Sequence, residues 1–140
     1  MPNENQLDRI RQWIHLNELE VAQFECARLV LAEPGNVPAL VIMSHLYQRA
    51  GRVQLAVRYA MDASAKLDAQ SDWHLILAVS AQLLDLGEDQ SARSCMCLIA
   101  IELPRHWIGA VDIAKHYRLL GDYENALLWL DMAEQQQLDL

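Results

Sequence analysis

The sequence predicts an all-α protein built from repeated helical hairpins, and three observations support this. Good helix formers such as Ala, Leu, Gln, Glu and Arg dominate the 140 residues, and strict polar–apolar alternation is rare. Short breaks recur at Asn17, Gly51, Gly87 and Gly121, with spacings of 34, 36 and 34 residues. Small residues recur at fixed distances from these breaks, which is the signature of a repeat architecture.

The phase of the repeat is defined by four sets of residues. Five residues after the breaks stand Ala22, Ala56, Ala92 and Ala126. Twelve residues after them stand Leu29, Ala63, Ile99 and Ala133. Seven residues before the breaks stand Ile10, Ser44, Ser80 and Ala114. Four residues before them stand Trp13, Tyr47, Leu83 and Tyr117. The small residues let two helix axes approach closely, and the bulky ones fill the grooves between the helices.

Each period is therefore predicted to be one helical hairpin. The first helices are expected over 3–16, 37–50, 73–86 and 107–120, each ending at a Gly or Asn that takes the left-handed conformation. The second helices follow at once and end near Pro34, Pro104 or a polar turn. The second period is two residues longer than its neighbours, so we expect a longer turn over 66–72.

This pattern resembles the tetratricopeptide repeat, whose consensus has a small residue, an aromatic three residues on, a Gly turn, an Ala and a closing Pro. The second repeat carries it as Ser44, Tyr47, Gly51, Ala56 and Ala63. The resemblance implies an α-solenoid of stacked antiparallel hairpins wound into a right-handed superhelix. It spans about residues 3–138, nearly the whole of one expected domain, 1–140, with repeats of about 3–36, 37–72, 73–106 and 107–140.

Two departures from the family's pattern affect these expectations. The tryptophan usual near the start of the first helix is displaced, because Trp73 and Trp107 stand about three residues earlier. The first repeat is degenerate: Ile10 is bulky where the other repeats have Ser or Ala, so we expect its helices to pack at a different angle.

Composition and charge exclude several classes of partner. The net charge of −8 argues against binding a nucleic-acid backbone or an anionic membrane surface. The start of the chain is neither a secretory signal nor a basic transit peptide, and no apolar run is long enough for membrane insertion. Three Cys residues form no disulfide framework. We therefore expect a cytoplasmic protein. A short, acidic chain of helical hairpins is similar to the chaperones of bacterial secretion systems, so a bacterial protein is expected.

The charges divide unevenly between the expected helices. The first helices carry five Lys or Arg and four Asp or Glu residues, a net charge of +1. The rest of the chain carries six Lys or Arg and fifteen Asp or Glu residues, a net charge of −9. In the resembled family the first helices line a concave groove. The groove residues that the resemblance implies are Arg11, Val41, His45, Gln48, Arg49, His74, Leu77, Ala81, Ile108, Val111, Lys115 and Arg118.

This groove is predicted to bind a peptide segment of a partner protein. Its basic groups would take carboxylates or backbone carbonyls, and its Val, Leu and Ile side chains would take apolar groups. The competing interpretation is that the charges only solvate one face. One subtype of the family grips the C-terminal carboxylate of chaperones through Lys and Asn. The corresponding positions here are Leu7, Arg11 and Ile42, so that ligand is not expected.

No residue pattern predicts catalysis, a metal or a cofactor. Cys95 and Cys97 are two apart on a helix, so their thiols point in different directions, and no second Cys pair completes a zinc site. The five histidines form no HxxxH pair. Ser44 and Ser80 are better explained as small residues of the hairpin contact. The protein is therefore not expected to be an enzyme.

Three functional hypotheses remain open. The first is a small adaptor or chaperone that shields part of a partner protein. The second is the N-terminal recognition arm of a larger enzyme, such as a transferase. The third is a self-associating structural protein. The last hairpin places apolar residues on more than one face, at Leu127, Leu128, Trp129, Leu130 and Met132. These would be covered by a following element or by a two-fold homodimer, or would form a small exposed patch.

Overall fold

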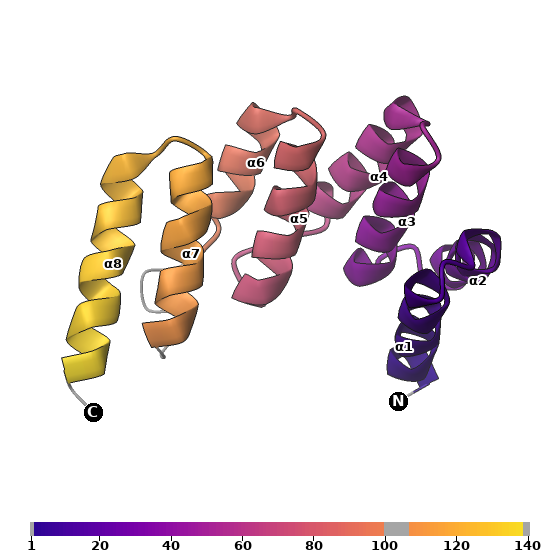
Figure 1. Ribbon diagram of the computed structural model, residues 1–140, viewed down its shortest axis with the longest axis horizontal. Helices are drawn as coiled ribbons and strands as arrows, with labels where there is room; N and C mark the ends of the chain where they lie inside the picture. Colours follow the sequence, from indigo (N-terminus) through magenta and orange to yellow (C-terminus); the bar gives the residue numbers. More distant parts are fainter. Residues whose placement is uncertain (1, 100–106, 139–140) are drawn as a thin grey trace. The chain divides into compact units, whose positions relative to one another are not determined.

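The described part of the chain is entirely helical apart from turns. The computed structural model describes residues 2–99 and 107–138. It contains α1 (Pro2–His15), α2 (Leu19–Ala32), α3 (Val37–Arg49), α4 (Val53–Ala65), α5 (Trp73–Asp85), α6 (Asp89–Met96), α7 (Trp107–Leu119) and α8 (Tyr123–Leu138) (Figure 1). Consecutive helices pack as the pairs α1–α2, α3–α4, α5–α6 and α7–α8. The predicted all-α fold of antiparallel hairpins is confirmed.

The first helix of every hairpin ends in the same left-handed cap. Asn17, Gly51, Gly87 and Gly121 have φ of 62°, 80°, 83° and 78°. At the second cap the Gly51 N–H donates to the Gln48 carbonyl at 3.1 Å, and the Arg52 N–H donates to the Tyr47 carbonyl at 2.9 Å. The same pair of hydrogen bonds recurs at the other three breaks. This is the Schellman arrangement, which satisfies carbonyls that a helix end otherwise leaves open.

Side-chain caps begin several of the helices. The Asn36 side chain accepts a hydrogen bond from the Ala39 N–H at 3.1 Å, ahead of α3, and Asp72 accepts from the His74 N–H at 2.8 Å, ahead of α5. The longer turn expected over 66–72 lies between the end of α4 and the start of α5, where Ser71 and Asp68 bond to each other and to nearby backbone N–H groups.

The chain forms two compact units, residues 1–66 and 67–140. The core of the first unit, from α1, α2 and α3, contains Leu7, Ile10, Ala22, Cys26, Leu29, Ala39, Met43 and Leu46. The Cys26 thiol donates to the Ala39 carbonyl at 3.2 Å, which ties the first hairpin to the second. The rings of Tyr47 and Tyr59 stack with centroids 5.5 Å apart across the α3–α4 hairpin.

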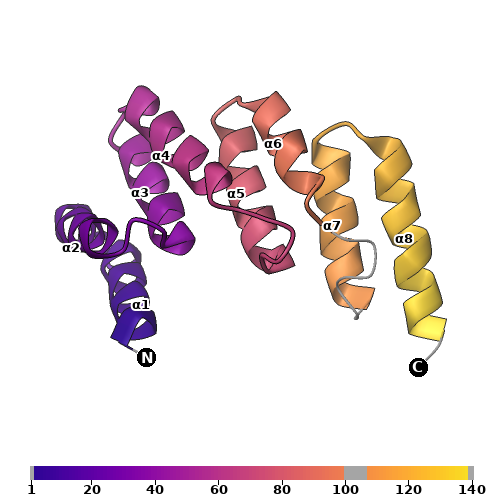
Figure 2. The ribbon, with the colours of Figure 1, turned by 180° about the vertical axis from the view of Figure 1, so that it is seen from behind.

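The first hairpin is packed differently from the second. In Figures 1 and 2, α3 and α4 run side by side, whereas α2 is seen nearly end-on next to α1. Ile10 is 1% exposed at this contact, where the second hairpin has Ser44. A bulky side chain between two helices keeps their axes apart, which agrees with the packing difference expected from the sequence.

The second unit is tied together across its two hairpins. The Arg93 guanidinium of α6 donates to the Leu120 carbonyl, just after α7, at 2.8 Å. The Tyr117 hydroxyl donates to the Met96 carbonyl at 3.3 Å. These bonds use carbonyls that lie near helix ends, where no intrahelical donor is available.

The helix α6 is shorter than expected. The sequence predicted a second helix ending near Pro104, but α6 ends at Met96, and Pro104 lies outside the described residues. The N–H groups of Cys97, Leu98 and Ile99 donate to carbonyls three residues earlier. The chain therefore tightens into 3₁₀-like turns after Met96.

Candidate functional site

A recess of about 370 Å³ lies in the second unit, bordered by α5 and α7. Its lining residues are Trp73, His74, Leu77, Ala78, Ala81, Asp112, Lys115, His116 and Leu119. Four of the residues that the sequence assigned to a groove meet here: His74, Leu77, Ala81 and Lys115. Helical spacing places His74, Leu77 and Ala81 on one face of α5, and the packing of α5 against α7 brings Lys115 next to them.

The α5 side of the recess is aromatic and aliphatic. The rings of Trp73 and His74 stack with centroids 3.6 Å apart and planes inclined by 29°. The Asp72 carboxylate caps the helix at the His74 N–H, which fixes the backbone from which both rings project. Leu77 follows one turn later and is half-buried. The α5 side of the recess therefore presents an apolar surface whose side chains are held in place by the first turn of α5.

The α7 side contains a buried polar network centred on His116. Its Nε2 lies 2.6 Å from the Ser80 hydroxyl, and that hydroxyl donates its single proton to the Ala92 carbonyl at 2.9 Å. The tautomer that fits this arrangement is the one in which Nε2 carries the hydrogen and donates to Ser80. Burial lowers the pKa of His116, which is 7% exposed, so the ring is neutral at pH 7.

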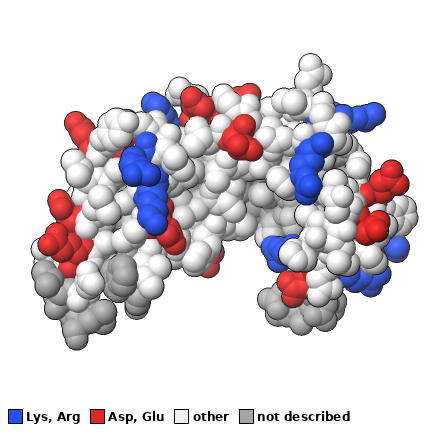
Figure 3. All heavy atoms as spheres, in the orientation of Figure 1, with Lys and Arg blue, Asp and Glu red and all other residues white. Residues whose placement is uncertain are grey.

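Charged groups stand at the rim of the recess on α7. Asp112 and Lys115 are exposed, and Lys115 makes no ion pair with any residue that the structure describes. Figure 3 shows blue side chains gathered over α7 and red ones over α8. The rim therefore offers a cation that is free to pair with a ligand.

The other predicted groove residues do not line this recess. On α7, Ile108 and Arg118 are exposed and Val111 is half-buried. On the first unit, Arg11 is exposed and pairs with Asp8 at 3.5 Å. The remaining residues, on α3, are Val41 and Gln48, which are half-buried, and His45 and Arg49, which are exposed. Their assignment to a groove stays a prediction.

His116 was not among the residues expected in the groove from the sequence. His116 stands five residues before its break. Leu46 and Gln82 stand at the same phase in their repeats, and both are buried. In the first repeat the same phase holds Gln12, which is exposed, so the phase alone did not mark position 116 as interior. It could not show that a buried histidine would reach Ser80 of the preceding hairpin.

The hydroxyls and thiols of the interior serve packing. Ser44 donates to the Ala56 carbonyl at 2.6 Å, as Ser80 does to Ala92, so each bonds across its hairpin. Burial raises the pKa of the Cys26 thiol to about 11, which keeps it protonated and unreactive. Among the described residues no group of three or more His, Cys, Asp or Glu side chains is placed to hold a metal ion.

Membrane insertion was not expected from the sequence. In the part of the chain that the structure describes, no helix combines the length and the apolar character that crossing a bilayer requires.

Comparisons with known proteins identify the fold. No protein-family model and no curated protein matches the sequence. A putative kinesin light chain of Podosopora anserina with nearly identical TPR-like repeats matches 97% of this chain and 75% of its own, at 15% identity and a TM-score of 0.67. MamA MSR-1 matches 91% and 72%, at 16% identity and a TM-score of 0.55. The chain has a tetratricopeptide-like repeat fold, as its sequence predicted.

Proposed function

We propose that the protein is an interaction module that binds a peptide segment of a partner protein in the recess bordered by α5 and α7. The observation that carries this proposal is the composition of the recess. An ordered apolar wall on α5 faces an unpaired lysine and an exposed aspartate on α7. Peptide sites need both parts, because apolar pockets supply affinity and a few polar groups fix the orientation.

Each side of the recess has a distinct role in this proposal. Trp73, Leu77 and Leu119 would contact an apolar side chain of the segment. Lys115 would pair with a carboxylate or a backbone carbonyl, and Asp112 would accept from a backbone N–H. The buried His116 is hydrogen-bonded to Ser80 and so connects α7 to α5. This bond holds the recess in shape before any ligand binds.

The same network supports binding rather than catalysis. Ser80 and His116 have the spacing of a nucleophile and its base, but a base must accept the hydroxyl proton. Here the Ser80 hydroxyl donates to the Ala92 carbonyl, and Ser80 is 0% exposed, so it is not presented to a substrate. We therefore place the protein among non-catalytic adaptors or chaperones, acting in the bacterial cytoplasm.

The test compares capture of partner proteins by three versions of the full chain. Lys115→Glu reverses the charge of the recess, and Lys66→Glu makes the same change at an exposed site outside it. A partner retained by the wild type and by Lys66→Glu but lost by Lys115→Glu would support the proposal. A partner retained equally by all three would contradict the assignment to this recess.

One observation favours a second candidate, self-association through the last hairpin. Leu127 is 62% exposed, and Leu128 and Leu130 are each 44% exposed, on the helix α8. Exposed apolar side chains on one helix are a typical dimer surface. Light scattering across a range of protein concentrations would test it, and a mass equal to one chain throughout would exclude it.

A further inference from the structure

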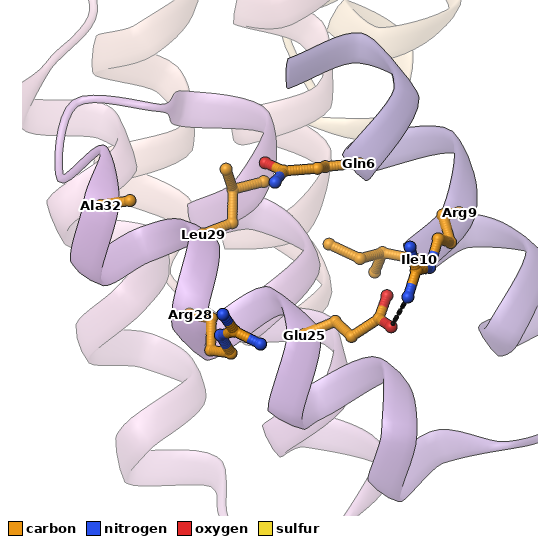
Figure 4. Close-up of a pocket in the computed structure, with 7 residues that line it drawn as sticks. All are labelled: Gln6, Arg9, Ile10, Glu25, Arg28, Leu29 and Ala32. Atoms are coloured by element: carbon orange, nitrogen blue, oxygen red, sulfur yellow. Dashed lines mark hydrogen bonds and ion pairs between the residues drawn. The ribbon is translucent and has the colours of Figure 1, made fainter. Parts of the chain in front are cut away.

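The first hairpin contains an open cleft of about 220 Å³, bordered by α1 and α2. Its lining residues are Gln6, Arg9, Ile10, Glu25, Arg28, Leu29 and Ala32 (Figure 4). The apolar side chains of Ile10 and Leu29 lie buried at its base, whereas Arg9 and Arg28 are exposed at its edge. Nothing in the repeat pattern assigns a function to this cleft.

Polar residues replace core residues at three phases of the repeat in this hairpin. Eleven residues before the breaks stand Gln6, Leu40, Ile76 and Ala110. Eight residues before them stand Arg9, Met43, Val79 and Ile113. Eight residues after them stand Glu25, Tyr59, Cys95 and Trp129. In the later repeats these side chains are buried, apart from the half-buried Tyr59. Only the first repeat has polar or charged side chains at all three of these positions.

The charges in the cleft do not cancel. The Arg9 Nη2 lies 2.8 Å from the Glu25 Oε1, and Figure 4 shows this ion pair reaching from α1 to α2. Arg28 forms no ion pair with any described residue, and its guanidinium carbon lies 6.0 Å from the centroid of the Phe24 ring. Two guanidinium groups therefore face one carboxylate, and the N–H edges of Arg28 are available to a ligand.

We propose that this cleft binds an acidic side chain, presented by a linear segment of a partner protein. Its carboxylate would take the two parallel N–H groups of Arg28, and its methylene stem would lie beside the exposed Ala32, above the buried Ile10 and Leu29. A cavity of this volume holds one or two side chains and no folded element. The site lies within one hairpin and does not depend on the function proposed for the recess of the second unit.

Charge complementarity favours an acidic occupant at this unit in particular. Residues 1–66 carry seven Lys or Arg and seven Asp or Glu residues, so the unit as a whole does not repel an anion. Residues 67–140 carry four Lys or Arg and twelve Asp or Glu residues, net −8, so an anion is attracted less to that unit as a whole than to the first. The excess arginine of the cleft is thus the local attraction that would select an acidic segment.

The experiment measures fluorescence polarisation of two labelled, acetylated and amidated peptides with the full chain at low salt. One peptide alternates Glu and Leu, and the other alternates Gln and Leu. We expect the Glu peptide to bind about three- to fivefold more tightly, because a solvent-exposed charge pair contributes modestly to affinity. Equal binding of the two peptides, or no binding of either, would overturn the proposal and leave the cleft as a solvated cap.

Two matched pairs of variants locate the binding. Arg28→Glu should weaken the Glu peptide about tenfold, whereas Arg58→Glu, an identical change at an exposed site on α4, should change its affinity less than about twofold. Glu25→Gln should tighten binding about threefold because it releases Arg9, whereas Glu20→Gln, at an exposed site on α2, should not. Equal effects within each pair would indicate diffuse electrostatics and contradict the site. Far-UV circular dichroism verifies that each variant is folded.

Discussion

The two compact units share one hairpin construction but differ in charge and in where they offer a cavity. Residues 1–66 have no net charge, and residues 67–140 carry all of the net −8. In the first unit the cleft lies within one hairpin, whereas in the second the recess is bordered by the first helices of successive hairpins. Both units keep buried alanines five residues after each break. The comparison shows that the packing phase constrains the interior and leaves the surface free to diverge.

The largest effect expected is from overpacking the buried alanines. Ala56→Leu in the first unit and Ala92→Leu in the second should each lower the free energy of unfolding by about 1–3 kcal/mol, because both residues are 0% exposed. Urea unfolding followed by circular dichroism measures this. The control is Ala65→Leu, at an exposed position near the end of α4. Unchanged stability in both core variants would show that the repeat phase is wrong.

The next largest loss of stability is expected from changing the glycines at the left-handed helix caps of the two units. Gly51→Ala and Gly87→Ala should each cost about 1–2 kcal/mol, because a Cβ disfavours positive φ even where no atom lies within 4 Å of it. Gly35→Ala is the matched control, since it also has open space around it but no positive φ. Thermal unfolding measures all three. A loss at Gly35 as large as at Gly51 would argue against the backbone explanation.

A third effect is pH-dependent and confined to the second unit. The pKa of His116 is lowered by burial, so the unfolded chain binds a proton at a pH where the folded chain does not. The contribution of His116 to the stability of the folded chain is therefore fully present above the pKa of the unfolded chain, about 6.5. It is lost as the pH falls through the lower pKa of the folded chain. His116→Leu, which copies Leu46 of the first unit, should flatten this dependence between pH 7 and 5.

The measurement is the unfolding midpoint of each protein at several pH values, with histidine NMR signals to follow the ring. His45→Leu is the control, because His45 is exposed. If His45→Leu flattens the profile as much as His116→Leu does, the acid sensitivity does not come from the buried network.

The smallest effect concerns the ion pair of the first hairpin. Glu25→Gln should change the free energy of unfolding by less than about 0.5 kcal/mol, because the Arg9 side chain is 66% exposed and surface ion pairs contribute little. Chemical unfolding at low and high salt would measure it. A loss above about 1 kcal/mol would mean that the pair is structural, and that Arg9 is not available for exchange with a ligand.

Local rules determined most of the secondary structure. The expected first helices, such as 37–50 and 73–86, differ from α3 and α5 by one residue at one end. A left-handed cap depends on the few residues around it, and the burial of residues such as Ala56 follows from helical periodicity. These properties are encoded within one or two turns of chain, so a single sequence is enough to predict them.

The sites were decided by the tertiary structure. The sequence assigned twelve residues to a groove, but only four of them line the recess bordered by α5 and α7. His116 joins them because it reaches Ser80, 36 residues earlier in the chain. The cleft of the first hairpin exists because polar side chains of α1 and α2 meet around Ile10. Cavities depend on the distance and angle between elements far apart in sequence, and periodicity within one helix does not contain that information.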